Sequence, residues 1–129
     1  MKYLLDTNAV IALLNHHPNF IARLKQHSPN DFVVSSIVMF ELYYGANKSQ
    51  KVKENLAKLD KLIFEEIPFD HLSAMEAGKI RAHLSKVGLP IGPYDTMIAG
   101  QAIAHDFILI THNVKEFERV PDLKFEDWL

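Results

Sequence analysis

Three acidic residues stand where apolar segments predict the interior of a folded protein. Asp6 follows the apolar residues 3–5, and Asp95 stands in the first turn of a predicted helix that continues with apolar side chains. Glu41 lies in residues 37–44, which are apolar on nearly every side of a helix, so we expect its carboxylate to be buried. A buried carboxylate without a cation or hydrogen bonds is strongly destabilising.

Each acid also has an ordinary structural explanation. Asp6 has a side chain suited to capping a helix, and Glu41 can pair with a buried lysine or arginine. The charge of Asp95 can be stabilised by the positive end of a helix dipole. Three carboxylates within reach of one another repel, however, so together they require a cation. Oxygen ligands select Mg²⁺ or Mn²⁺. Such an ion acidifies a water and neutralises charge on an attacked phosphate, which predicts phosphoryl transfer.

The order of predicted elements places these acids at one edge of a sheet. Short apolar segments alternate with helical patterns, which predicts a mostly parallel sheet with helices on both faces, a three-layer α/β/α domain spanning residues 1–129. Ligands of such sheets bind outside the carboxyl ends of the strands, where Asp6, Thr111 and Asn113 stand. Strands are expected near residues 3–5, 32–34, 64–69, 107–110 and 124–125. Helices are expected near 7–14, 18–24, 37–44, 50–62 and 93–105, with Gly45 ending the third of them, and a further helix capped by Asp70 or Ser73 is expected to run to about Val87.

Composition narrows the possible functions. Hydrophobic residues make up 48% and charged residues 23%, as in an ordinary globular protein. The absence of cysteine excludes a disulfide framework and a thiolate zinc site. No apolar stretch is long enough for a membrane span or a signal peptide, so we expect a cytoplasmic protein. The net charge of −2 disfavours binding of nucleic acid through charge alone. Five lysines nevertheless lie within residues 48–61, where they can form either the solvated face of a helix or a contact surface for RNA.

Four segments carry a family resemblance. They are LLDTN from residue 4, ELYYG from residue 41, PIGPYDTMIA from residue 90 and THNVKEF from residue 111. In this order they closely resemble the VapC-type toxins of the PIN-domain ribonuclease family, and the resemblance runs along the whole chain. It implies a PIN-like fold and a bacterial Mg²⁺- or Mn²⁺-dependent endoribonuclease that cuts structured RNA, either tRNA or ribosomal RNA. It also implies a homodimer, a VapB-type antitoxin that holds the enzyme inactive, and a higher assembly with that antitoxin.

The resemblance also assigns roles to individual residues. Asp6 and Asp95 match the metal-binding aspartates, and Glu41 matches the glutamate that helps to hold the metal and its water. Thr7 and Asn8 match polar residues that support the first aspartate. We expect Glu41 to orient or deprotonate the attacking water, and the products to carry a 5′-phosphate and a 3′-hydroxyl.

The sequence departs from the family at one position. Many PIN domains have an aspartate where Asn113 stands, and the nearest acid is Glu116. Either residue can complete the site, with Thr111 as a supporting polar group. A phosphatase with Asp6 as nucleophile is an alternative, but its usual second acid is replaced by Asn8. A degenerate domain that binds RNA or a partner without cutting is the other alternative, and Asn113 is its only support.

Several further residues are candidates for binding. Arg81 and Lys86 precede the loop to Asp95 and are possible RNA contacts. His112 is the only histidine near the proposed site, and no histidine spacing indicates catalysis. Four large side chains are expected in the core or in a subunit interface, namely Met39, Phe40, Tyr43 and Tyr44.

Overall fold

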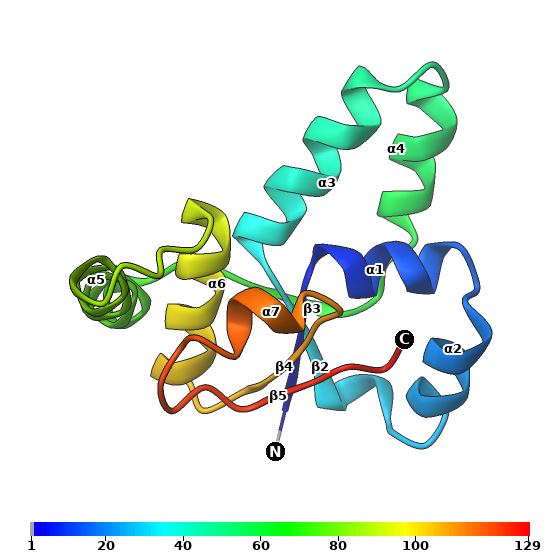
Figure 1. Cartoon of the computed structure of the whole chain (residues 1–129). Coiled ribbons are helices and arrows are strands. Elements are labelled where there is room, and N and C mark those ends of the chain that lie inside the picture. Colours follow the sequence, from blue (N-terminus) through cyan, green and yellow to red (C-terminus); the bar gives the residue numbers. More distant parts are fainter. Residues whose placement is uncertain (1) are drawn as a thin grey trace.

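The computed structural model describes residues 2–129, in which a five-stranded sheet lies between helices (Figure 1). Every pair of neighbouring strands is parallel, and the strand order is β3-β2-β1-β4-β5. The predicted α/β architecture with a parallel central sheet is therefore confirmed. The strands are β1 (Tyr3–Leu5), β2 (Phe32–Ser35), β3 (Glu65–Ile67), β4 (Ile108–Ile110) and β5 (Phe125–Glu126).

The central strand β1 positions the functional edge. Leu4 and Leu5 are fully buried, as expected for a strand covered on both faces. β1 pairs with β2 on one side and with β4 on the other, so the chain reverses its winding direction between β1 and β4. The backbone N–H of Asp6 donates to the carbonyl of Ile110 at 3.1 Å, which holds the two strand ends together. A crevice at such a switch point is where open α/β sheets bind ligands.

The helices cover the sheet from two sides. In Figure 1, α5 and α6 lie to one side of the strands and α1 and α2 to the other, while α3 and α4 form an arm that projects outward. Within residues 2–129, no helix is long and apolar enough to span a membrane. The helices are α1 (Thr7–Leu14), α2 (Pro18–Leu24), α3 (Ser36–Lys48), α4 (Val52–Asp60), α5 (His71–Lys86), α6 (Pro93–Ala104) and α7 (Val114–Phe117), with a 3₁₀ turn at Pro29–Asp31.

One helical prediction was wrong, and one short helix was missed. α3 does not end at Gly45 but continues to Lys48, since a helical glycine costs only about 1 kcal/mol and Ala46, just beyond it, is buried. The last turn is closed by Ser49, whose backbone N–H and hydroxyl both donate to the carbonyl of Ala46. α7 was not predicted, because four residues are too few to display a helical period. Its fully buried Phe117 anchors it beside the sheet.

Candidate active site

Asp6 lies at the carboxyl end of β1 with only 5% of its surface exposed. Its Oδ1 accepts a hydrogen bond from the backbone N–H of Ala9 at 2.9 Å, so Asp6 does cap α1 as its ordinary explanation requires. Burial raises the pKa of Asp6 to about 6, against the opposing effect of hydrogen bonds from Thr111 and from backbone N–H groups. The hydrogen bond of the cap does not offset the cost of burying this carboxylate, so Asp6 favours binding of a proton or a cation.

Glu41 is half-exposed, and the prediction that it is buried was wrong. Because α3 projects from the sheet, the rest of the protein covers only one side of this helix. Leu42 on the covered side is buried, whereas Phe40 is 53% exposed. Partial burial raises the pKa of Glu41, and the nearby Thr7 hydroxyl lowers it by a smaller amount. No lysine or arginine of residues 2–129 pairs with Glu41. The proposed salt-bridge explanation therefore fails.

Asp95 lies in the first turn of α6 and is linked to α7 by hydrogen bonds. The Asn113 side chain donates from Nδ2 to Asp95 Oδ2 at 3.0 Å and to Glu116 Oε2 at 2.8 Å. Burial, the contact with Glu116 and the charges of Asp6 and Glu41 together raise the pKa of Asp95 to about 8. The same contact lowers the pKa of Glu116. Without a cation, the surroundings of Asp95 therefore disfavour its charged form.

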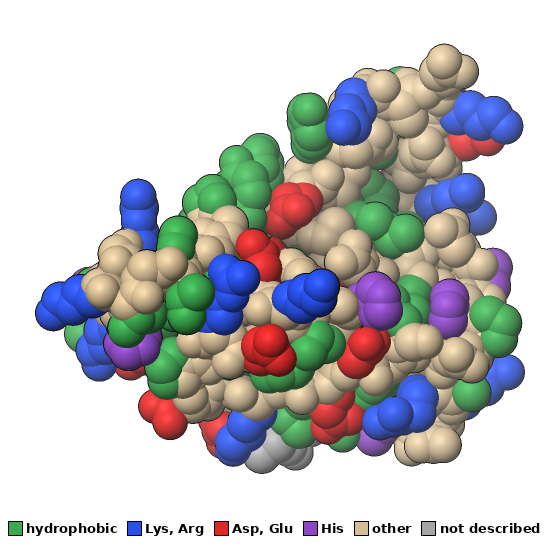
Figure 2. All heavy atoms as spheres, in the orientation of Figure 1, with side chains coloured by type: hydrophobic (Ala, Val, Ile, Leu, Met, Phe, Trp, Pro, Cys, Tyr) green, Lys and Arg blue, Asp and Glu red, His purple; other side chains and the backbone are tan. Residues whose placement is uncertain are grey.

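The structure therefore brings the predicted acids to one edge of the sheet. The negative charges of Asp6 and Glu41 both act on Asp95, and Glu116 touches it. Acidic side chains are visible where the α3–α4 arm meets the rest of the molecule (Figure 2). A cavity of about 210 Å³ opens beside them and is lined by Thr7 and Glu41 among others.

The ligand atoms available at the site fit a hard cation, although they do not form a complete coordination shell. Among residues 2–129, no three acidic or histidine side chains converge closely enough to hold a metal ion as they stand. The available donors are carboxylate and hydroxyl oxygens, as Mg²⁺ and Mn²⁺ prefer. Thr7 Oγ1 is buried beside Glu41 and is a further oxygen at this site. The raised pKa values of Asp6 and Asp95 result first from burial and then from neighbouring acids, and a bound cation would offset both effects.

The supporting polar residues differ in their contributions. Thr111 is buried, its hydroxyl accepts from the backbone N–H of Asn113 at 3.0 Å, and it also lowers the pKa of Asp6. Asn8 has an exposed side chain and acts on Asp6 only through its backbone N–H. His112 is exposed and lies 3.1 Å from Asp127 across the sheet edge.

Arg81 and Lys86, the two predicted RNA contacts, both lie on α5. Arg81 lines a cavity of about 280 Å³ together with Pro90 and Pro93, on the loop that leads to Asp95. Lys86 is exposed in the last turn of α5 and does not line this cavity.

The aromatic residues of α3 are not in the core. Met39 is buried as predicted, but Phe40, Tyr43 and Tyr44 are exposed, because they follow the outer face of the arm. Phe40 packs against Tyr94 of α6, with ring centroids 5.5 Å apart. For these three residues, the core alternative was wrong and the subunit-interface alternative stays a prediction.

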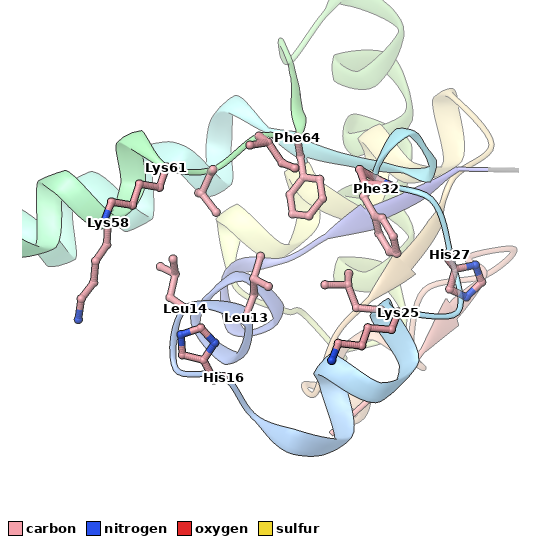
Figure 3. A pocket seen from close by; sticks show the side chains of 13 residues that line it. Leu13, Leu14, His16, Lys25, His27, Phe32, Lys58, Lys61 and Phe64 are labelled. Carbon is pink, nitrogen blue, oxygen red and sulfur yellow. The ribbon is translucent and has the colours of Figure 1, made fainter.

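Sequence reasoning missed a large apolar groove. Its volume is about 650 Å³, and Figure 3 shows Leu13, Phe32 and Phe64 pointing into it. It shares the lining residues Leu14 and Lys58 with the cavity that Glu41 lines, so the two cavities are neighbours. No pattern in the sequence marks it, because its lining comes from four separate segments. Basic side chains surround it, namely His16, Lys25, His27, Lys58 and Lys61.

Comparisons with known proteins agree with this architecture. The PIN domain family matches residues 3–123. The tRNA(fMet)-specific endonuclease VapC of Salmonella typhimurium is 39% identical over 99% of this chain and 98% of its own, and ribonuclease VapC2 of Rickettsia felis is 40% identical over the same shares. The crystal structure of VapBC2 from Rickettsia felis, bound to a DNA fragment from its promoter, contains a chain with a TM-score of 0.93, 39% identity and full coverage of both chains. DNA-bound VapBC from Salmonella typhimurium gives a TM-score of 0.93 at 38% identity, covering 100% of this chain and 99% of that one. The chain belongs to the PIN-domain family and, within it, to the VapC-type proteins.

Proposed function

We propose that residues 1–129 form a single nuclease domain, a metal-dependent endoribonuclease toxin that hydrolyses structured RNA and is neutralised by a VapB-type antitoxin. The observation that carries this proposal is the position of Asp6, Glu41, Asp95 and Glu116 at one edge of the sheet, where the pKa is raised at the first three. The names of the bacterial relatives support an RNA substrate, specifically tRNA, and a cytoplasmic location belongs to the same proposal.

In this proposal Asp6 and Asp95 hold the cation and Glu41 handles the attacking water. A bound Mg²⁺ or Mn²⁺ supplies charge neutralisation at the phosphate and lowers the pKa of water. Glu41 is half-exposed beside a solvent-filled cavity, and its raised pKa improves it as a proton acceptor. The water oxygen bonds to phosphorus as the bond to the 3′ oxygen breaks, leaving a 5′-phosphate and a 3′-hydroxyl. Arg81 and Lys86 are proposed to contact RNA phosphates beside this site.

Removal of metal provides the direct test. Purified chain without antitoxin is incubated with total cellular RNA in Mg²⁺ or in EDTA, and the new RNA ends are sequenced. We expect discrete internal cuts, with 5′-phosphate ends, that appear only with Mg²⁺ or Mn²⁺. Cleavage that persists in EDTA would contradict the metal requirement. Intact RNA despite measured metal binding would favour a degenerate binding domain instead.

The antitoxin is proposed to occupy the groove shown in Figure 3. Its apolar interior and basic margin suit an amphipathic segment with acidic side chains over Lys25, Lys58 and Lys61. The neighbouring cavity, which Glu41 lines, suits a basic side chain at the end of that segment. A partner bound across both cavities would block access to the acids.

Reversal of charge at the margin of the groove should weaken this complex. We expect the double variant Lys25→Glu/Lys61→Glu to bind the cognate antitoxin about tenfold more weakly or worse, because attraction becomes repulsion. Calorimetry at two salt concentrations measures the affinity and its salt dependence. Lys53→Glu is the matched control, since Lys53 lies on α4 but does not line the groove. Equal affinity of the double variant and the control would place the antitoxin elsewhere.

A further inference from the structure

Asn113 has a bridging position within the acid cluster. Its Nδ2 donates to one oxygen of Asp95 and to one of Glu116, at 3.0 and 2.8 Å. Both partners are carboxylates, so both N–H bonds of the amide are used and the orientation of the amide is set by its neighbours. The other oxygen of Glu116 accepts from the backbone N–H of Gly92 at 3.2 Å. These hydrogen bonds connect the first turn of α6 to α7.

Asn113 is itself held firmly. Its backbone N–H donates to the buried Thr111 hydroxyl at 3.0 Å, and its carbonyl accepts from the N–H of Phe117 at 3.3 Å. Phe117 is fully buried. The amide therefore projects from a fixed backbone, as a residue that orients other side chains must.

We infer that Asn113 is a positioning residue, which holds the carboxylates of Asp95 and Glu116 side by side. This inference rests on the proposed function for its catalytic meaning. A neutral donor between two carboxylates reduces their repulsion and sets their separation. An aspartate at position 113 has no N–H to donate and would add a third negative charge at the same point. The aspartate that many PIN domains have at this position would therefore reduce the activity of this chain.

The first test adds that acid. We expect Asn113→Asp to reduce the rate of RNA cleavage by about 10- to 100-fold, the range for groups that orient metal ligands. Without metal, its melting temperature should fall below that of the unmodified chain. Asn30→Asp, which adds the same charge in the exposed turn Pro29–Asp31, should change neither quantity. Asn113→Asp with full or increased activity would show that an acid belongs at this position and would overturn the inference.

The second test separates positioning from a general structural role. Asn113→Ala, Glu116→Ala and the double variant form a cycle measured both by cleavage rate and by metal-free melting temperature. Because part of the effect of Asn113 passes through Glu116, the loss of cleavage rate in the double variant should be smaller than the product of the two single losses, and the two losses of melting temperature should not add. Strictly additive effects would overturn the inference. The melting cycle needs neither RNA nor metal, so it judges Asn113 even if the unmodified chain cuts no RNA, a result that would count against the proposed function instead.

Discussion

Replacing Asp6 with asparagine is expected to lower RNA cleavage by about 100- to 1000-fold, as loss of one group in a charge-stabilising site does in other enzymes. Asp6 is 5% exposed, lies at the switch point between β1 and β4, and acts electrostatically on Asp95. Asparagine keeps the size and one oxygen of the side chain but loses the negative charge. In the proposed mechanism, this removes half of the aspartate charge that holds the cation.

The substitution should leave the fold intact, which makes the loss interpretable. Asp6 caps α1 by accepting from the backbone N–H of Ala9, and asparagine caps helices about as well as aspartate. Circular dichroism and the melting temperature check this point. Asp60→Asn, at the exposed end of α4, loses the same charge away from the site and should keep full activity. Cleavage by Asp6→Asn at the rate of this control would remove Asp6 from the mechanism.

Some features of the site could be predicted because they depend on local sequence. The position of Asp6 follows from a short apolar strand that ends in a polar residue, and the structure places it at the sheet edge as expected. Asp95 follows Gly92 and Pro93, which begin α6 where the sequence indicates. Strand ends and helix starts are encoded by a few adjacent residues, so the carboxyl edge of the sheet can be located without a structure.

Other features depend on contacts between distant segments and could not be predicted. Glu41 has apolar neighbours in sequence, but α3 projects as an arm, so the outer face of this helix has nothing to cover it. The choice between Asn113 and Glu116 required their hydrogen bonds to Asp95 and Gly92, which lie about one helix away in the chain. The groove beside Leu14 is lined by four segments, and no single segment has a pattern that marks a cavity.

Crowding of the acids should also make the metal-free protein less stable as the pH rises. An acid whose pKa is higher in the folded than in the unfolded protein stabilises the fold while it is protonated, and that stability is lost as the pH rises through the folded pKa. For Asp95 the window runs from 3.8, its ordinary value, to about 8, and for Asp6 it runs from 3.8 to about 6. Glu116, whose pKa is lowered, loses stability only at lower pH. Above pH 5, the raised groups should therefore dominate.

Asp95→Asn tests this argument, because asparagine resembles the protonated aspartate at every pH. Its amide can accept from Asn113 and donate to Glu116, so the hydrogen bonds around it are kept. In EDTA we expect a melting temperature several degrees above that of the unmodified chain at pH 8, and a difference that becomes smaller as the pH falls towards 4, where Asp95 is increasingly protonated in the unfolded chain as well as in the folded one.

Added Mg²⁺ should reverse this order of stability. It binds the folded state and stabilises the unmodified chain by mass action, whereas Asp95→Asn should gain much less and should not cleave RNA. Asp60→Asn should show neither effect at either pH. An Asp95→Asn variant less stable than the unmodified chain at pH 8 in EDTA would mean that the charge of Asp95 is compensated within the protein. The reason for placing a cation among these acids would then be lost, even if the chain still cut RNA.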